Sequence, residues 1–297
     1  MLRLNKALTA SLSALVTLAV ATPVHAEWGL NLQTPVTPIG EGILGLHNMI
    51  LLICTVIFIG VFSVMFYSLY AHRKSKGHKP SQFSHSTFAE VTWTVIPTLI
   101  LIGMAIPSTA MLIDMEDTSK ADMTVKITGY QWKWHYDYLD SGVSFYSNLA
   151  TDRAEILNEK EKGENYLLEV DNEVVLPVGK KIRFLVTADD VIHSWWVPQL
   201  AVKKDAIPGF INEIWTRIDE PGIYRGQCTE LCGKDHGYMP VVVRAVSQEE
   251  FDAWVAENAP TAEQSEATPS VTGGESLVAD NTITTDGGAG QSASAVR

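Results

Sequence analysis

The sequence is short of positive charge, of cysteine and of repeated segments. Its 297 residues include 22 lysines and arginines against 34 aspartates and glutamates, which gives a formal net charge of −12. An acidic chain is a poor partner for nucleic acid and a good partner for a basic protein, although part of the excess also serves solubility. The three cysteines form no Cys-x-x-Cys-His motif, so we expect no covalently attached haem in this chain.

The first 26 residues have the pattern of a secretory signal peptide. They carry Arg3 and Lys6, then an apolar stretch too short to span a bilayer, and end on the small-residue pattern Val24-His25-Ala26. An N-terminal anchor helix is less favoured, because serine and threonine interrupt the run and a proline ends it. We therefore expect cleavage after Ala26 and a mature chain that begins near Glu27.

Charge is absent from two longer apolar runs, residues 49–70 and 91–113. Each run is long enough for the ~20 residues that a membrane helix needs, so residues 27–113 predict a two-helix transmembrane hairpin. Four basic residues in the intervening segment place that segment on the cytoplasmic side. Both termini are then expected outside. The four residues are Arg73, Lys74, Lys76 and Lys79.

Residues 114–258 change to short alternating or β-branched runs separated by turn residues, which predicts a small all-β sandwich or barrel. It ends in SQEEFDAWVAEN, where Ser247 and Glu250 have the spacing of a capping box and precede a short amphipathic helix. Residues 259–297 are rich in small and acidic residues and have little to bury. We expect a disordered tail there.

The loop GQCTELCGKDHGYMP, residues 226–240, concentrates groups that bind soft metal ions. Cys228 and Cys232 are four apart, His236 follows four residues later and Met239 three later, while His193 lies upstream in DVIHSWWVP. Two thiolates, two imidazoles and a thioether together are typical of a copper site.

Three interpretations of this loop remain open. In an oxidising compartment Cys228 and Cys232 could form a disulfide, which would leave His236 and Met239 unexplained. A structural zinc site with two cysteines and two histidines is the second interpretation. The third is two copper ions bridged by two thiolates, since a mononuclear blue-copper site uses one cysteine. Cys54, inside the first apolar run, is expected to serve packing alone.

Together with GYQWKWHYDY, residues 129–138, and the apolar hairpin, these motifs resemble subunit II of the haem-copper cytochrome c oxidases. The resemblance covers about residues 40–257 and implies a cupredoxin-like fold for the β domain. It implies a binuclear Cu(A) centre, and it implies that the carboxylate of Glu230 helps bind a magnesium or manganese ion at the contact with subunit I. The implied copper ligands are His193, Cys228, the backbone carbonyl of Glu230, Cys232, His236 and Met239.

The resemblance also implies a function and partners. Electrons from cytochrome c would enter at Trp132, pass to the copper centre and go on to haem in subunit I of a proton-pumping oxidase, where oxygen is reduced. Subunits I and III would be partners in a bacterial inner membrane, with the copper domain in the periplasm. Glu90 matches the entrance of a proton pathway, although an acid at the end of a span is also a common interfacial residue. The acids expected to dock cytochrome c are Asp137, Asp171, Asp189 and Asp190.

Other aromatic residues of GYQWKWHYDY, namely Trp134, Tyr136 and Tyr138, are expected in the core. Two residues depart from the family pattern: Lys133 adds a positive charge beside Trp132, and Phe210 stands where many relatives carry arginine. The first is expected to weaken docking and the second to alter the contact with subunit I.

Three other classes of protein remain open. A soluble Cu(A) reductase, such as a nitrous oxide reductase, would lack the hairpin and carry a large propeller domain. A quinol oxidase subunit would share the architecture but lack the copper ligands. A copper carrier would have the same ligands without an oxidase partner.

Overall fold

The computed structural model describes residue 29, residues 31–77, residue 79 and residues 81–260. The expected signal peptide, residues 1–26, lies outside the described residues, as does the expected tail beyond residue 260.

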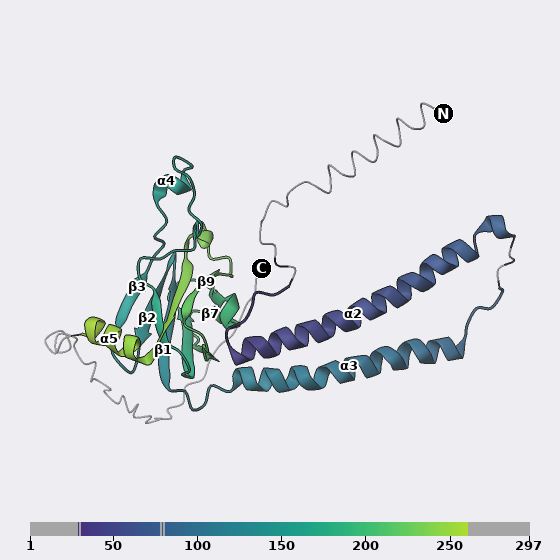
Figure 1. Ribbon diagram of the computed structural model, residues 1–297, viewed down its shortest axis with the longest axis horizontal. Coiled ribbons are helices and arrows are strands. Elements are labelled where there is room, and N and C mark those ends of the chain that lie inside the picture. The colour runs from purple at the N-terminus through teal and green to yellow at the C-terminus, as the bar shows by residue number, and fades with distance from the viewer. Residues whose placement is uncertain (1–28, 30, 78, 80, 261–297) are drawn as a thin grey trace, which may run out of the picture. The chain divides into compact units, whose positions relative to one another are not determined.

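Two long helices contain the two apolar runs: α2, Pro38–Ala71, and α3, Thr87–Glu116 (Figure 1). A short 3₁₀ turn, Lys74–Lys76, lies between them. Both helices are long and apolar enough to cross a membrane. In the most apolar segment of each helix, no residue is buried by the rest of the described chain. Since a bare apolar helix surface is unfavourable in water, these surfaces need lipid or another protein chain around them.

Helix α2 begins at Pro38, eleven residues before the predicted span, residues 49–70. Its start is set by Thr37, whose hydroxyl accepts a hydrogen bond from the Gly40 N–H at 3.0 Å, and by Pro38 at the first helical position. The apolar run therefore marks only part of the helix. In α3, Pro97 and Pro107 lie inside the helix without ending it.

The β domain consists of two five-stranded sheets. The first has the order β3-β2-β1-β5-β8 and the second the order β4-β10-β9-β6-β7. The pairs β1–β5 and β4–β10 are parallel, and the other pairs are antiparallel. The strands of the first sheet are β1 Met123–Tyr130, β2 Lys133–Tyr138, β3 Ser144–Ser147, β5 Ile182–Ala188 and β8 Asn212–Thr216. Those of the second are β4 Val174–Pro177, β6 His193–Val197, β7 Val202–Ala206, β9 Gly222–Cys228 and β10 Pro240–Val246.

The inner faces of the two sheets form the core. Burial alternates residue by residue along β5, as expected for a strand with one face packed and one face wet. Trp134, Tyr136 and Tyr138 are fully buried, which confirms their predicted place in the core. The Trp195 indole N–H donates to the Tyr136 hydroxyl across the sandwich at 3.1 Å. The predicted fold class, a two-helix apolar hairpin followed by a cupredoxin-like β-sandwich, is confirmed.

Helix α5, Gln248–Asn258, follows the last strand and has the predicted capping box. The Glu250 N–H donates to the Ser247 hydroxyl at 3.2 Å, and the Ser247 N–H donates to the Glu250 carboxylate at 3.0 Å. Phe251 and Trp254 of this helix pack against the Tyr138 ring. The helix therefore covers one end of the core.

Between β3 and β4 the chain makes an excursion that the sequence analysis did not anticipate. It contains the short helix α4, Arg153–Ile156, capped by the Asp152 carboxylate, and projects from one end of the β domain (Figure 1). An ion pair of 2.6 Å between Glu169 and Arg225 ties its returning arm to β9.

Candidate metal centre

The strand order brings the two metal-binding motifs together. Strand β6 begins at His193 and pairs antiparallel with β9, which ends at Cys228, and Trp195 lies opposite Cys228 in that pair. Because the start of one antiparallel strand lies beside the end of its neighbour, His193 is placed next to the loop that follows β9. A 3₁₀ turn, His236–Tyr238, then leads through Met239 into β10.

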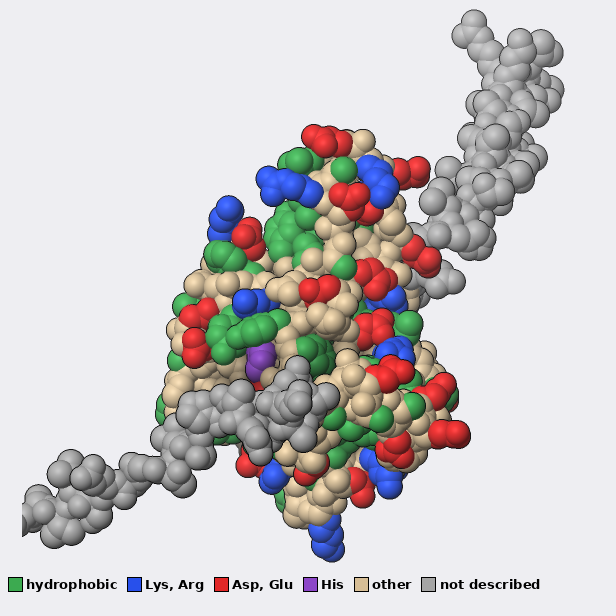
Figure 2. Space-filling view, turned by 90° about the vertical axis from the view of Figure 1, so that its left-hand side faces the viewer, with side chains coloured by type: hydrophobic (Ala, Val, Ile, Leu, Met, Phe, Trp, Pro, Cys, Tyr) green, Lys and Arg blue, Asp and Glu red, His purple; other side chains and the backbone are tan. Residues whose placement is uncertain are grey.

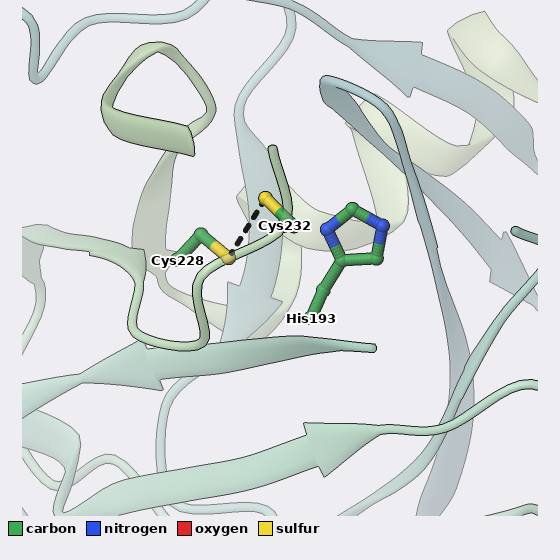
Figure 3. A group of neighbouring side chains, drawn as sticks. All are labelled: His193, Cys228 and Cys232. Atoms are coloured by element: carbon green, nitrogen blue, oxygen red, sulfur yellow. Dashed lines mark hydrogen bonds between the residues drawn. The ribbon is translucent and has the colours of Figure 1, made fainter. Parts of the chain in front are cut away.

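The donor atoms of His193, Cys228 and Cys232 lie within 4.8 Å of one another (Figure 3). The two sulfur atoms are 3.9 Å apart. The Cys232 sulfur lies 3.5 Å from His236 Nδ1 and 3.5 Å from the Met239 sulfur. The structure therefore brings all five side chains of the predicted ligand set into one cluster.

The backbone carbonyl of Glu230, the sixth predicted donor, is in the same cluster. The Cys228 Sγ–H donates to it at 3.3 Å. The Glu230 side chain itself is exposed, so its carbonyl and its carboxylate face different surroundings.

The two cysteines are not joined. Both are free thiols, and their sulfur separation of 3.9 Å is far beyond the ~2.05 Å of a disulfide bond. The disulfide interpretation of the loop is therefore wrong for this structure.

Most of the cluster is buried, and one buried nitrogen has no partner. His193, Cys228, Cys232 and Met239 are all buried, and His236 is half-buried. His193 Nδ1 makes no hydrogen bond with any described residue. A buried acceptor or donor without a partner is costly, so this nitrogen, beside two thiols, fits a site that is completed by a metal ion.

The two thiols have opposite pKa shifts. Burial opposes ionisation of Cys228, but its interactions with His193, with the Ser194 and Glu230 backbone and with His236 outweigh this effect and lower its pKa to about 7. Burial raises the pKa of Cys232 to about 12, and the adjacent Cys228 charge adds to this. One thiolate therefore forms near neutral pH, and it repels a second.

Asp190 orients His193. Its Oδ1 lies 2.8 Å from His193 Nε2 and accepts the backbone N–H of Val191 at 2.6 Å, and its Oδ2 accepts the backbone N–H of Gln131 at 2.7 Å. Burial opposes the charge of Asp190, yet these hydrogen bonds lower its pKa. Asp190, expected at the docking surface, therefore contacts a predicted metal ligand. The i, i+3 spacing to His193 was a signal that could have indicated this contact.

Gly129 of β1 leaves the space that His193 fills. A Cβ atom on Gly129 would lie 2.8 Å from His193 Cδ2 and 3.0 Å from its Cγ. The first residue of GYQWKWHYDY is thus part of the cradle of the site, which the sequence did not indicate.

Trp132 lies beside the second cysteine. Its indole N–H donates to the Cys232 carbonyl at 3.1 Å, and its side chain is half-buried. Trp132, where electrons are predicted to enter the protein, is therefore in direct contact with the backbone of a predicted metal ligand.

The remaining predicted docking acids differ in their local contacts. Asp137 accepts from the Ser144 hydroxyl at 2.7 Å and lies 3.3 Å from His135, and Asp171 accepts from Asn148 at 2.7 and 2.8 Å. Asp189 is exposed. Figure 2 shows acidic and basic side chains interspersed with apolar ones on the face it presents.

The other singled-out residues lie elsewhere. The Lys133 ammonium lies over the Tyr146 ring, 4.2 Å from its centroid, and Phe210 is exposed between β7 and β8. Glu90 lies in the first turn of α3. Cys54 is exposed on α2 and lines a groove between α2 and α3.

Two family models match the chain. The model for the transmembrane domain of cytochrome c oxidase subunit II matches residues 25–111, and the model for the periplasmic domain of the same subunit matches residues 123–246.

Similar proteins come from bacteria and from an alga. The probable cytochrome c oxidase subunit 2 of Rickettsia conorii is 43% identical over 236 residues, which is 79% of this chain and 73% of that protein. Cytochrome c oxidase subunit 2 of Cyanidium caldarium is 44% identical over 230 residues, 77% of this chain and 90% of that protein. The crystal structure of the periplasmic domain of subunit II of cytochrome oxidase from Bradyrhizobium japonicum is 46% identical, with a TM-score of 0.42, and covers 48% of this chain and 96% of that one.

Proposed function

The chain belongs to the cytochrome c oxidase subunit II family, and on that premise we propose that it is the subunit through which electrons enter a proton-pumping oxidase. As a subunit of a haem-copper oxidase complex it works with the other oxidase subunits. The finer proposal is that it accepts electrons from cytochrome c at a binuclear copper centre and passes them to haem in subunit I, where oxygen is reduced to water.

The observation that carries the proposal is the buried cluster of unpaired soft donors. Two free thiols 3.9 Å apart, a thioether 3.5 Å from one of them and an unpartnered imidazole nitrogen converge in one place. The residues that would hold two copper ions are His193, Cys228, the Glu230 carbonyl, Cys232, His236 and Met239. When bound, the copper would supply a one-electron carrier.

The protein's own groups prepare the site. Asp190 accepts the His193 Nε2–H, which leaves the Nδ1 lone pair facing the sulfur atoms. In this tautomer Nδ1 carries no proton, and no described group donates a hydrogen bond to it. Burial of the cysteines and Met239 keeps water from the donors and keeps the local dielectric low.

A zinc site is the less suitable alternative. The buried Met239 sulfur touches the Cys232 sulfur, and a thioether is a ligand that suits copper rather than zinc. A quinol oxidase subunit would lack these donors, and family membership with an apolar hairpin disfavours a copper carrier.

We also propose the remaining roles that follow from family membership. The exposed Glu230 carboxylate helps bind magnesium or manganese at the contact with subunit I, and Glu90 starts a proton pathway. Two apolar helices anchor the chain in a membrane. In our proposal this is the bacterial inner membrane, with the signal peptide removed after Ala26 and the β domain, residues 114–258, in the periplasm.

The copper content of the full chain tests the proposed function. We expect two copper ions per chain and a purple oxidised form, because two bridging thiolates spread one unpaired electron over both ions. Elemental analysis and an electron paramagnetic resonance spectrum of the detergent-solubilised chain measure this. One copper per chain, with the hyperfine pattern of a single nucleus, would contradict the binuclear centre.

A further inference from the structure

Gln131, the residue before Trp132, contacts both the ligand loop and the acid that orients His193. Its side-chain Nε2 donates to the Cys232 carbonyl at 2.8 Å, and its backbone N–H donates to Asp190 Oδ2 at 2.7 Å. The other oxygen of Asp190 lies 2.8 Å from His193 Nε2. One residue therefore connects the loop that carries Cys232 with the side chain that orients His193.

The Cys232 carbonyl accepts two hydrogen bonds at once. The Gln131 amide donates to it at 2.8 Å and the Trp132 indole donates to it at 3.1 Å. A carbonyl oxygen has two lone pairs, so these two donors use its whole capacity. The Gln131 amide thus holds in place the Cys232 carbonyl, to which the Trp132 indole also donates a hydrogen bond.

The loop backbone lies directly against both side chains at Gly233. This glycine has a φ of +113°, and a Cβ atom on it would lie 3.0 Å from Gln131 Nε2 and 3.2 Å from Trp132 Cζ2. Distances this short would require the amide or the indole to shift by a few tenths of an ångström before a side chain could fit, and the positive φ favours glycine here. The amide, the indole and the loop backbone are therefore in contact, and a displacement of one displaces the others.

We propose that Gln131 is a positioning residue, which holds the Trp132 indole against the Cys232 carbonyl and joins it through Asp190 to His193. This inference rests on the proposed function. Gln131 would act on the transfer of an electron from Trp132 to the cluster, not on the binding of cytochrome c. Losing its donor frees one lone pair of the Cys232 carbonyl and lets the indole shift relative to the loop.

The test compares Gln131→Met with Gln227→Met in the complete oxidase. Methionine keeps the length of the side chain and removes its donor. Gln227 is also exposed and precedes Cys228 directly, but its side chain makes no hydrogen bond among the described residues, so it controls for loss of a polar group beside the site. Stopped-flow mixing with reduced cytochrome c separates the association rate from the rate within the docked complex.

For Gln131→Met we expect two copper ions, an unchanged association rate with unchanged salt dependence, and electron transfer within the complex slowed roughly tenfold, as for a reactive group misplaced by a fraction of an ångström. Gln227→Met should match the wild type. A wild-type rate within the complex for Gln131→Met, loss of its copper, or an equal slowing in Gln227→Met would each overturn the proposal.

A second readout needs neither copper nor cytochrome. In the copper-free full chain labelled with 5-fluorotryptophan, the ¹⁹F resonance that disappears in Trp132→Phe belongs to Trp132. It should shift or broaden in Gln131→Met and stay in place in Gln227→Met; an unmoved resonance in Gln131→Met counts against the proposal. If the wild type lacks two copper ions, the proposed function fails, whereas this resonance still decides whether Gln131 holds the indole.

Discussion

At the scale of single residues, the hydrogen-bond partners of His193 and Asp190 determine how the site is arranged. His193 Nε2 donates a hydrogen bond to Asp190, and Nδ1 has no partner among the described residues. Asp190 in turn accepts two backbone N–H groups, so its carboxylate has little freedom to turn. The two acids Asp189 and Asp190, adjacent in sequence, therefore have different surroundings, and only one of them contacts the cluster.

Replacing Asp190 and Asp189 in turn tests whether only Asp190 supports the metal site. Asp190→Ala removes the acceptor of His193 Nε2, so we expect the affinity of the full chain for copper to fall about 10- to 100-fold, as for other residues that orient a metal-binding histidine. Asp189→Ala is the matched control, because this exposed carboxylate makes no side-chain hydrogen bond among the described residues. Competitive copper titration measures both. Equal affinities of the two variants would mean that Asp190 does not orient His193.

The sequence predicted single residues well only where they stand close together in it. Four of the five side-chain donors lie in one segment, residues 228–239, and their spacing alone indicates a metal site. Gln131 donates to Cys232 across a separation of 101 residues and to Asp190 across 59. Contacts of this kind leave no periodicity or motif, because they exist only after the strands have paired.

At the scale of elements, the periodic patterns predicted the two helices and the β-sandwich but not the pairing of the strands. Alternation places Phe184 and Val186 of β5 in the core, yet it does not indicate that β5 pairs in parallel with β1. The excursion with α4 escaped prediction for a related reason. Four helical residues after Asp152 are too few for a helical period to emerge from the sequence.

The close approach of β6 and β9 depends on Gly226. A Cβ atom on this residue would overlap the backbone carbonyl oxygen of Trp196 and lie 2.9 Å from Val197 Cγ2. Because a backbone carbonyl in a sheet cannot turn aside as a side chain can, Gly226→Ala must push the two strands apart. Cys228 lies two residues further along β9 and would move with them.

For Gly226→Ala we therefore expect a loss of about 1–3 kcal/mol in the free energy of unfolding, the usual cost of overpacking, together with weaker copper binding. Gly237→Ala is the control, since Gly237 lies in the same ligand segment and a Cβ atom there meets nothing within 4 Å. Denaturant unfolding of the full chain, followed by tryptophan fluorescence, measures the difference. A Gly226→Ala chain as stable as Gly237→Ala would show that β6 and β9 do not need this glycine.

At the scale of the whole molecule, the proposed function requires that a net charge of −12 guide a basic partner to the Trp132 indole. Long-range attraction depends on the summed charge of the surface rather than on single contacts. Asp137 and Asp171 already serve local hydrogen bonds, and the Lys133 ammonium is held over the Tyr146 ring. The electrostatic attraction of the partner and the electron transfer through Trp132 should therefore be separable by mutation.

Two variants separate them. Neutralising Asp137 and Asp189 together, as Asp137→Asn with Asp189→Asn, should lower the association rate with a basic cytochrome c severalfold at low salt and flatten its dependence on ionic strength, because screening then has less attraction to remove. Trp132→Ala should leave the association rate and its salt dependence unchanged and cut electron transfer within the docked complex, since the Trp132 indole is an aromatic group hydrogen-bonded to the Cys232 carbonyl. Stopped-flow kinetics from low to high ionic strength measure the two rates.

Trp196→Ala controls for the loss of a half-buried indole, because the Trp196 ring lies near Lys203 and makes no hydrogen bond to the ligand loop among the described residues. It should leave the rate within the complex unchanged. If Trp132→Ala instead slows association and becomes less sensitive to salt, the indole serves binding, and electrons reach the cluster by another route. Lys133 would then be the residue to replace next, because it carries a positive charge and directly follows Trp132 in the sequence.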